Sequence, residues 1–407
     1  MTSWEYDAAV IGAGPAGLAT AISLAAVGCK TVIAGPPFNS DPARPDTRTT
    51  ALLQASVRLL QNTGVWQHCE PEAAPLEMIR LIDDTGRLIR APEVAFDCNE
   101  LGGEPFGFNI SNTALVAALY QRAASIPGLT LIETSGATRI EPGGTHVRIT
   151  LAEGREITAE LVAAADGRKS ICRDAANIGT KNWSYPQKAL AFNFSHSEPH
   201  NNCSNEFHRS AGPFTTVPLP GTNSSLVWVE TPQQADHLLS MPDQDIIGIM
   251  SERLHGILGT IMDIGPRGAF PLTGMSVEQY AARRIALVGE AAHVIPPIGA
   301  QGLNLGFRDA AALAGCVSDN SKLNDAGSEK ILQGYNQSRR NDVGSRTFAV
   351  DLFNRSLISA YLPVHAARGL GLHLMNSVGP LRRLFMREGL ASNSRLPKLM
   401  QPSQQVF

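Results

Sequence analysis

The sequence predicts a two-lobed protein of the α/β class, α+β overall, with a helical C-terminal region. Three observations support this prediction. The chain opens with a strand, a glycine turn, a helix and a strand; residues 177–272 are rich in short strands and turns; and the pattern is helical from about Asn336. At 407 residues the chain is also long for one compact core, which favours two lobes.

The opening stretch, Tyr6–Gly35, has the order of a dinucleotide-binding unit. An apolar strand at Tyr6–Ile11 precedes a G-x-G-x-x-G turn, a helix of about Pro15–Val27 and a second strand at Lys30–Ala34. In such a turn the first glycine permits the sharp bend, the second lets a pyrophosphate approach the backbone, and the third lets the helix pack on the strand. The turn consists of Gly12, Ala13, Gly14, Pro15, Ala16 and Gly17. Its context favours a Rossmann-like dinucleotide site over a purely structural turn.

One expected element of this unit is missing. The second strand usually ends in an acidic residue that binds the adenosine ribose, whereas this strand ends in Ala34-Gly35-Pro36. Either another group holds the ribose or the site is weakened, and the sequence leaves both alternatives open.

The rest of the first lobe alternates helices and strands. We expect a helix at Thr49–Gly64, a hairpin at Leu76–Ala91 that turns at residues 83–86, and a helix from Ser111 to about Ser125. Ser111 or Asn112 can cap that last helix. The strands expected next are Leu129–Glu133, Ala137–Glu141, Val147–Leu151 and Glu156–Ala165.

Two positions of the first lobe have both a structural and a functional interpretation. Asp166-Gly167 follows the last of these strands and is either a ligand-facing junction of the sheet or a plain turn. Arg48 precedes the helix expected at 49–64 and is either a solvated arginine or a contact to a bound phosphate. Local sequence decides neither case.

The second lobe is predicted at Asn177–Leu272. We expect an antiparallel sheet with one helix at its edge, the helix lying near Asp243–Leu258. The strands expected there are Ala189–His196, Glu206–Arg209, Phe214–Leu219 and Ser225–Glu230. The chain returns to the first lobe in a strand at residues 283–289.

A loop-to-helix block, Gly289–Ala314, follows that strand. Pro296-Pro297 and four glycines force irregular backbone, and a helix begins near Gly302. Such a junction can offer backbone N–H groups to an electron-rich ring system. His293 is either a satisfied loop histidine or a base, and Asn304 is either a helix cap or a ligand contact.

Composition and charge exclude several classes of protein. Apolar content of 43% and charged content of 17% fit a soluble globular protein, and the net charge of −3 gives no general attraction to nucleic acid. The N-terminal segment begins with a strand and is interrupted by glycines. We therefore expect no signal peptide and no membrane span, and we expect a cytoplasmic location. Six scattered cysteines without metal-ligand spacing predict reduced thiols and no metal site.

The C-terminal region is basic. Residues 355–407 contain seven basic residues and one acidic residue, Glu388. Two interpretations stay open: an amphipathic tail that rests on an anionic membrane surface, or a helix that covers the core with its charges in solvent.

Three blocks together resemble the single-component flavoprotein aromatic hydroxylases, which carry FAD and use NAD(P)H and O₂. These blocks are Gly12–Gly17, Asp166-Gly167, and Gly289-Glu290 with the Pro- and Gly-rich run after it. The chain resembles most the branch that hydroxylates polyprenylated phenols in ubiquinone biosynthesis. The residues that carry this likeness are Arg48–Leu52, Gly64–Trp66, Phe270–Leu272, Gly369-Leu370 and Gly379–Leu381. The run Pro296–Gly302 is also similar to the 4-hydroxybenzoate hydroxylases.

The resemblance implies roles for individual residues. The glycine turn would hold the FAD pyrophosphate, Arg48 and Asn112 would contact the FAD phosphates and ribityl chain, and Asp166 would lie near the pyrophosphate and also serve NAD(P)H. Glu290, after Gly289, stands where the family normally has an Asp that binds the ribityl hydroxyl, and its extra methylene moves the carboxylate oxygens. The residues that would border the isoalloxazine ring are Pro297, Gly302, Leu303 and Asn304.

The activity that the resemblance implies is hydroxylation of a lipophilic aromatic substrate through a C4a-hydroperoxyflavin, a chemistry supplied mostly by the cofactor. No catalytic acid or base is identified. Two alternatives stay open: a hydroxylase of a small soluble phenolic acid, and a non-hydroxylating, flavin-poor scaffold subunit of a biosynthetic complex. A third alternative is an FAD reductase or a halogenase on the same scaffold, although the W-x-W-x-I-P run usual in such halogenases is absent. The sequence leaves the oligomeric state open.

The same resemblance divides the chain into domains. The FAD-binding domain is expected at 1–69, 106–179 and 276–355, the substrate domain at 70–105 and 180–275, and the C-terminal helical region at 356–407. From this architecture we expect five residues to line the substrate side: Phe192, Phe207, Phe214, Trp228 and Pro271.

Overall fold

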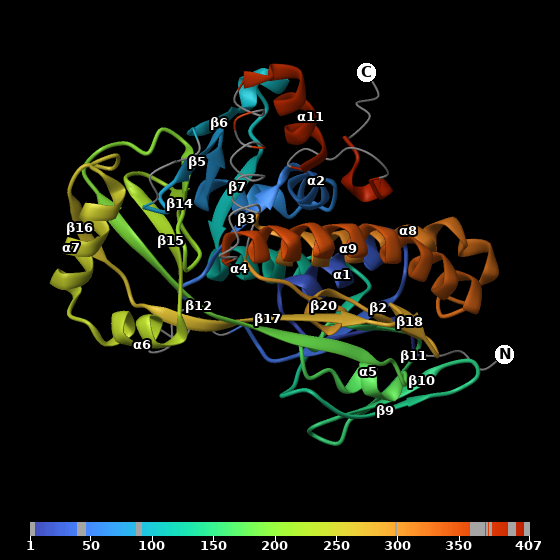
Figure 1. The fold of residues 1–407 in the computed structure, drawn as a ribbon. Helices are drawn as coiled ribbons and strands as arrows, with labels where there is room; N and C mark the ends of the chain where they lie inside the picture. The colour runs from blue at the N-terminus through green and yellow to red at the C-terminus, as the bar shows by residue number, and fades with distance from the viewer. Residues whose placement is uncertain are drawn as a thin grey trace.

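The computed structural model contains two large sheets that lie side by side, joined by a small third sheet (Figure 1). It describes residues 5–38, 46–86, 92–297, 299–358, 377–389 and 396–402, together with Gly371 and His373. Both α-helices and β-sheets are present, as the α/β (α+β) prediction requires.

The first sheet has eight strands, and its centre is parallel. The parallel strands are β8 (Leu129–Glu133), β2 (Thr31–Gly35), β1 (Tyr6–Ile11), β11 (Glu156–Ala164) and β19 (Ile285–Leu287), in that spatial order. Antiparallel strands extend it: β9 (Ala137–Pro142), β10 (Val147–Leu151) and β18 (Ala281–Ala282). The central strands are buried on both faces, which explains their continuous apolar sequence.

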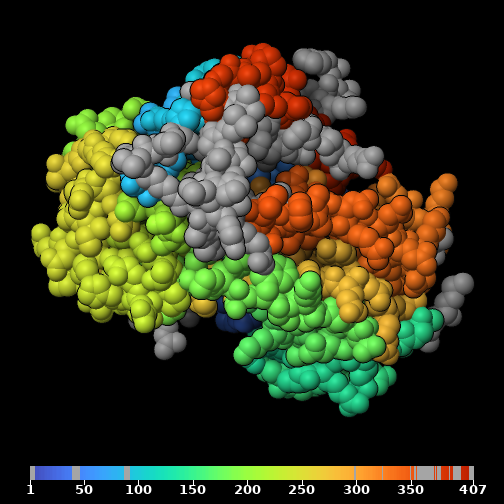
Figure 2. Space-filling view, in the orientation of Figure 1, coloured from blue at the N-terminus to red at the C-terminus, as the bar shows by residue number. Residues whose placement is uncertain are grey.

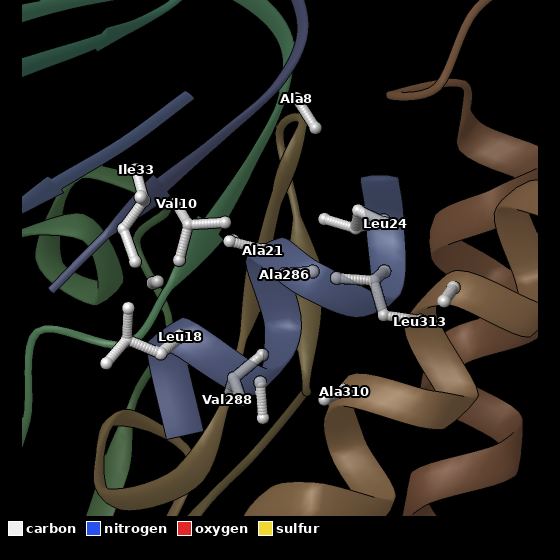
Figure 3. Close-up of a cluster of buried hydrophobic side chains, with 14 of the residues drawn as sticks. Ala8, Val10, Leu18, Ala21, Leu24, Ile33, Ala286, Val288, Ala310 and Leu313 are labelled. Atoms are coloured by element: carbon white, nitrogen blue, oxygen red, sulfur yellow. The ribbon is translucent and has the colours of Figure 1, made fainter. Parts of the chain in front are cut away.

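Helices cover this sheet. Helix α1 (Pro15–Ala26) lies between the central strands and helix α8 (Gln301–Asp319), and Figure 3 shows its leucine and alanine side chains packed against both. The other helices of this lobe are α4 (Asn112–Ala124), α5 (Ile171–Ala175) and α9 (Glu329–Ile358), with the short 3-10 helices η3 (Gly289–Ala291) and η4 (Ser321–Leu323). The Ser111 hydroxyl caps α4 by accepting from the Ala114 N–H at 3.2 Å, so Ser111 rather than Asn112 is the cap.

The second sheet has nine strands drawn from distant parts of the chain. They are β5 (Met78–Asp83), β6 (Val94–Asp97), β12 (Thr180–His196), β13 (Cys203–His208), β14 (Pro213–Leu219), β15 (Asn223–Glu230), β16 (Ile261–Ile264), β17 (Gly268–Val277) and β20 (His293–Val294). Within residues 177–272 the paired strands are antiparallel, as predicted, whereas β5, from an earlier part of the chain, lies parallel to β13. The strand that returns from β5 is β6, beyond the predicted hairpin, and residues 87–91 of that hairpin lie outside the described residues.

Two helices, not the single one expected, cover one face of the second sheet. They are α6 (Pro232–Ser240) and α7 (Asp243–Leu254), seen beside β12 and β16 in Figure 1. Helix α6 begins with Thr231, whose hydroxyl caps Gln234, and with Pro232 at the first helical position. The Thr231-Pro232 helix start is visible in the sequence, but it is only two residues long and lies among predicted strands, so helix α6 was not predicted.

A three-stranded sheet connects the lobes, and it corrects the helix predicted at 49–64. Residues Thr49–Leu53 form strand β3, which pairs with β7 (Gly107–Ser111), and only Gln54–Asn62 form helix α2. The two β-branched threonines favour the strand, and β7 supplies a partner that local sequence cannot reveal. Strand β4 (Ala73–Leu76) completes the sheet, and α3 (Trp66–Cys69), η1 (Glu70–Glu72) and η2 (Cys98–Leu101) flank it.

The C-terminal region contributes helix α11 (Gly379–Gly389) and η5 (Lys398–Met400). Met386 of α11 is buried against Val94, Phe96 and Phe106, and Arg382 pairs with Glu100 at 3.0 Å. No helix of the described ranges is long and apolar enough to span a membrane. In the space-filling view α11 lies at the top of the molecule, above the lobe that contains α8 and α9 (Figure 2).

Candidate functional site

Three turns that are far apart in the sequence meet at one edge of the first sheet. Ile11, at the end of β1, is the register partner of Ala164 in β11, and Ala164 is the partner of Leu287 in β19. Ala165 N–H donates to the Ile11 carbonyl and Val288 N–H to the Ala164 carbonyl, each at 2.8 Å. Because these strands are parallel, the turns after Gly12, Ala165 and Val288 follow one another along the carboxyl edge, where open α/β sheets bind ligands.

The three motif glycines differ in their surroundings. A Cβ on Gly12 would lie 2.2 Å from the Ala165 carbonyl oxygen, and one on Gly17 would lie 1.9 Å from the Gly12 carbonyl oxygen. Gly12 also has φ +109°, a conformation that favours glycine. A Cβ on Gly14, by contrast, meets nothing within 4 Å. Gly12 and Gly17 are therefore required by packing, whereas Gly14 borders open space in front of the turn.

The open space lies at the N-terminus of α1. Gly14 is the N-cap residue of α1, no side chain caps the helix, and Pro15 is in its first turn. The backbone N–H groups of the first turn therefore have no side-chain partner, as an anion site at a helix N-terminus requires. This arrangement fits a pyrophosphate group.

The first and third turns approach each other closely at Ala16 and Gly289. A Cβ on Gly289 would lie 3.1 Å from the Ala16 Cβ, and one on Gly306 would lie 3.3 Å from it. Gly289 also has φ +59°. Gly306, in α8, was missed by sequence reasoning because a glycine inside a helix gives no signal without its neighbour across the helix contact.

The second turn has an acceptor without a partner. The Asp166 Oδ2 accepts from the Cys172 N–H at 3.2 Å, while the buried Asp166 Oδ1 has no hydrogen-bond partner among the described residues. A buried, unsatisfied carboxylate oxygen is costly unless a ligand or water completes it. The orphaned oxygen at this edge thus agrees with a bound polar group.

Arg173, a residue that sequence reasoning missed, clips the second turn to the third. Its Nη2 donates to the Arg168 carbonyl at 2.9 Å and its Nη1 to the Ala291 carbonyl at 3.1 Å. The side chain is buried, and its Nε has no hydrogen-bond partner among the described residues. Arg173 follows Gly167 by six residues, and the sequence there does not distinguish a buried arginine from a solvated arginine on a helix surface.

Glu290 is held by a salt bridge. Its Oε1 accepts from Arg168 Nη2 at 2.9 Å, and Arg168 Nη1 also donates to the Thr273 hydroxyl at 3.1 Å. Both charged side chains are half exposed, at 56% and 50%. Such an exposed pair contributes about 0–1 kcal/mol, so the Glu290 carboxylate is oriented but not fixed.

Arg48 lies at the seam between the lobes and forms a bidentate pair with Asp46. Its Nε and Nη2 donate to the two Asp46 oxygens at 2.7 and 2.6 Å, and its guanidinium lies 5.5 Å from the centre of the Phe270 ring. The hydrogen bonds to Asp46 raise the pKa of Arg48, and Glu290 adds to this. Asn112 donates to Asp46 at 3.2 Å and accepts from the Thr50 hydroxyl at 2.6 Å. The structure therefore brings Arg48 and Asn112 together through one carboxylate.

The start of α8 offers a second set of backbone donors. Ala300 begins the helix with φ +54° and gives it no side-chain cap, Pro297 before it is exposed, and Leu303 is half-buried. A Cβ on Gly302 would meet nothing within 4 Å, so the backbone there is accessible. Ile298 in this loop lies outside the described residues.

The Asn304 side chain is fully occupied within the protein. Its Oδ1 accepts from the Leu53 N–H and the Ser56 hydroxyl, at 2.9 and 2.6 Å, and its Nδ2 donates to the carbonyls of Ala51 and Ala300 at 2.8 and 2.5 Å. It therefore fastens the first turn of α8 to β3 and α2. Any contact to a ligand is left to its backbone.

A buried ion-pair network supports the third turn from behind. Asp309 of α8 is fully buried, and it accepts from the Gly289 N–H at 2.9 Å, from His293 Nε2 at 2.7 Å and from Arg339 Nε at 2.7 Å. Burial acts to raise the pKa of Asp309, but the charges of His293 and Arg339 outweigh it and hold the pKa below its ordinary value. His293 is thus a satisfied buried residue that positions the turn.

Four of the five residues expected to line the substrate side do not. Phe192, Phe207, Phe214 and Trp228 are at most 1% exposed and pack in one core with residues of α6 and α7. In a strand, successive side chains alternate between faces, and the predicted set occupies the face that the two helices cover. The opposite face meets the first lobe, where the Thr49 hydroxyl donates to Ser225 Oγ at 2.8 Å and Asn109 Nδ2 to the Pro218 carbonyl at 2.9 Å.

Groups for other chemistries are not assembled in the described part of the chain. No cluster of three His, Cys, Asp or Glu side chains with the geometry of a metal site is found there. All six cysteines are free, and burial raises the pKa of Cys29 and of Cys69 to about 12. Such thiols are unreactive near neutral pH.

Comparisons with known proteins agree with this geometry. The chain matches the family described as FAD binding domain over residues 5–348. It is 33% identical to the ubiquinone hydroxylase UbiL of Rhodospirillum rubrum, over 95% of this chain and 90% of that protein. It is 31% identical to the 3-demethoxyubiquinol 3-hydroxylase of Escherichia coli, over 96% of this chain and 100% of that one. The solved structure of p-nitrophenol 4-monooxygenase PnpA from Pseudomonas putida superposes with a TM-score of 0.75 at 18% identity, covering 94% of this chain and 96% of that one.

Proposed function

The chain belongs to the FAD binding domain family, within the flavoprotein aromatic hydroxylases, and from that premise we propose that it hydroxylates a polyprenylated phenol in ubiquinone biosynthesis with NAD(P)H and O₂. The observation that carries the proposal is the convergence of three turns on one sheet edge, with Gly14 and Gly302 both facing open space. We propose that one FAD molecule binds at both places.

The residues present fit FAD at specific points. The first turn of α1, Gly14 and the Asp166 carboxylate would hold the pyrophosphate, with Arg48 and Asn112 on the phosphates and ribityl chain. The uncapped start of α8, at Gly302 to Asn304, would place N–H groups and the positive end of a helix beside the flavin, which stabilises negative charge there. When bound and reduced by NAD(P)H, FAD supplies the oxygen-activating chemistry.

The remaining work of the protein is to orient the substrate ring and exclude water. We assign this to the seam between the lobes, where Phe270 lies against Arg48 and the Thr49–Ser225 hydrogen bond closes the contact. The domains are proposed as 1–69, 106–179 and 276–355 for FAD, 70–105 and 180–275 for substrate, and 356–407 as a helical C-terminal region. None of the five residues expected to line the substrate side stays in this proposal, because Pro271 pairs with Lys188, whose ammonium group donates to Asp236 of α6 on the helix-covered face.

A lipophilic substrate is favoured over a small phenolic acid by the names of the relatives and by helix α11. That helix buries Met386 but exposes Leu381 and Leu384, at 41% and 55%, beside the exposed Arg383 and Arg387. We propose that this face touches an anionic membrane, from which the protein would draw its substrate.

The membrane contact is tested by replacing Leu381 and Leu384 together with serine. Binding to vesicles that contain anionic lipid should fall about tenfold in the double variant, because about 2 kcal/mol or less of apolar transfer is lost. Met262→Ser, at an exposed methionine of β16, is the matched control and should bind as the unmodified protein does. Equal binding of all three proteins would contradict the proposal.

The function is tested by a flavin absorption spectrum of the purified protein, followed by turnover with NADH or NADPH. We expect a yellow protein that adds one oxygen atom from ¹⁸O₂ to a prenylated phenol. Equal activity on 4-hydroxybenzoate would favour a hydroxylase of small phenolic acids. A colourless protein that stays without flavin after FAD is added would favour a scaffold subunit.

A further inference from the structure

Strand β2 ends in Gly35, at the place where dinucleotide-binding sheets usually have the acidic residue that binds the ribose. The structure gives a reason for the glycine. A Cβ on Gly35 would lie 2.4 Å from the Ala13 nitrogen and 2.8 Å from the Ala13 Cβ. The glycine turn thus rests directly on the end of β2, and a carboxylate side chain at position 35 would displace the turn.

The neighbouring strand offers a carboxylate at the same level. Strand β8 lies parallel to β2, Glu133 is the register partner of Gly35, and the Thr134 N–H donates to the Gly35 carbonyl at 3.0 Å. Register partners of a parallel pair point to the same face, and neighbouring strands lie about 4.8 Å apart. Glu133 is therefore at the carboxyl edge one strand further out, on the face of α1 and α4.

Glu133 is exposed and oriented from one side. The Tyr120 hydroxyl, on α4, donates to Glu133 Oε1 at 3.2 Å, and the Tyr120 ring lies 6.2 Å from the Phe38 ring, which follows β2. Burial raises the pKa of Tyr120, and the hydrogen bond to Glu133 adds to this, so the hydroxyl stays a donor. Among the described residues no other hydrogen bond reaches this carboxylate.

We infer that Glu133 binds the ribose hydroxyls of the adenosine half of FAD, in place of the acidic residue that β2 lacks. This inference rests on the proposed binding of FAD at the Gly12–Gly17 turn. A carboxylate accepts hydrogen bonds from both hydroxyls of a ribose, and the Tyr120 hydroxyl fixes the carboxylate for that contact. The glycine at position 35 then keeps the turn close to the sheet, and β8 supplies the missing charge.

The test is a binding experiment that needs no turnover. The dissociation constant of FAD is measured by flavin fluorescence for the unmodified protein, for Glu133→Gln and for Glu133→Ala, and again with an FAD analogue that lacks the 2′-hydroxyl of the adenosine ribose. We expect each variant to bind FAD about tenfold more weakly. The analogue should also bind the unmodified protein about tenfold more weakly, but should lose little more in the variants.

Glu156→Gln is the matched control. Glu156 is an exposed glutamate at the first position of β11, at the opposite edge of the same sheet, and its substitution should leave the binding of FAD unchanged. A second comparison uses Asp41→Asn. Asp41 is an acidic residue that follows β2 in the sequence and lies outside the described residues, so it is the alternative carboxylate for the ribose.

The outcomes separate this inference from the proposed function. Unmodified protein that binds no FAD would overturn both. Unmodified protein that binds FAD, together with Glu133 variants that bind it equally well or that keep the full penalty for the analogue, would overturn the inference alone. The same result follows if Asp41→Asn, and neither Glu133 variant, removes the penalty.

Discussion

The two large sheets differ in the part of the sheet that they contribute to the site. The first sheet contributes its carboxyl edge, where three turns meet around Gly12, Asp166 and Gly289. The second sheet contributes a face, the one opposite α6 and α7, which meets β3 and β7. An edge site depends on backbone conformation, which glycines reveal in the sequence. A face site depends on which of two alternating sets of side chains is turned inward, which alternation alone does not reveal.

The largest effect is expected behind the edge, at Asp309. Asp309→Asn leaves the buried Arg339 with one less carboxylate, and removing one partner of a buried pair costs about 3–5 kcal/mol of unfolding free energy. The check is chemical denaturation at neutral pH. Asp263→Asn, at an exposed aspartate of β16, is the control and should change stability by less than about 0.5 kcal/mol.

The same variant predicts a pH dependence. The pKa of Asp309 is lowered in the folded protein, so its contribution is present above the unfolded value of about 3.9 and is lost as the pH falls below it. The unmodified protein should therefore lose stability more steeply than Asp309→Asn between about pH 4 and pH 2. Parallel curves for the two proteins would show that Asp309 does not stabilise the fold through its charge.

In the second sheet, substitution of a core residue should affect mainly stability, whereas substitution of a residue at the seam between the lobes should affect mainly turnover. Trp228 is fully buried, with the Arg253 guanidinium 4.2 Å from its ring centre, and Trp228→Ala should cost about 3–5 kcal/mol of stability. Phe270 is 39% exposed at the seam, so Phe270→Ala should cost less than about 1 kcal/mol. Phe270→Ala should instead lower the product formed per NAD(P)H consumed. A Trp228 variant of normal stability with poor coupling would reverse the assignment of the two faces.

A smaller effect separates two glycines of the same turn. Gly17→Ala would place a Cβ 1.9 Å from the Gly12 carbonyl oxygen, whereas Gly14→Ala meets no neighbour. We expect Gly17→Ala to lower the unfolding free energy of the flavin-free protein by about 3 kcal/mol, and Gly14→Ala to leave it within about 0.5 kcal/mol. Gly14→Ala should nevertheless weaken FAD binding, because its methyl group enters the space in front of the turn. Thermal melts without FAD, followed by FAD titration, distinguish the two.

The sequence predicted the edge of the first sheet better than the face of the second, because glycines reveal backbone conformation whereas alternation does not reveal which face is turned inward. Strands β1, β8 and β10 were predicted at their observed bounds, and the three turns that meet were all identified. The helix predicted at 49–64 was right for Gln54–Asn62 but wrong for Thr49–Leu53, because the partner of β3 is more than fifty residues away, in β7. The aromatic residues of the second lobe were recognised as important, but the helices that cover them were incompletely predicted, and so the wrong face was chosen.

The last prediction concerns Glu290, which stands where the family pattern has an aspartate. Its pair with Arg168 is half exposed and is worth about 1 kcal/mol or less, which bounds any effect on FAD affinity at about fivefold. Glu290→Asp should shorten the reach to Arg168 and free the carboxylate for the ribityl chain, and FAD should bind about two- to fivefold more tightly. Arg168→Ala, which releases Glu290 without shortening it, is the matched comparison. If only the aspartate variant tightens binding, the position of the oxygens matters; if both do, the salt bridge itself competes with the cofactor. Weaker binding in Glu290→Asp would mean that the glutamate, with its longer reach, is the residue to which this site is adapted.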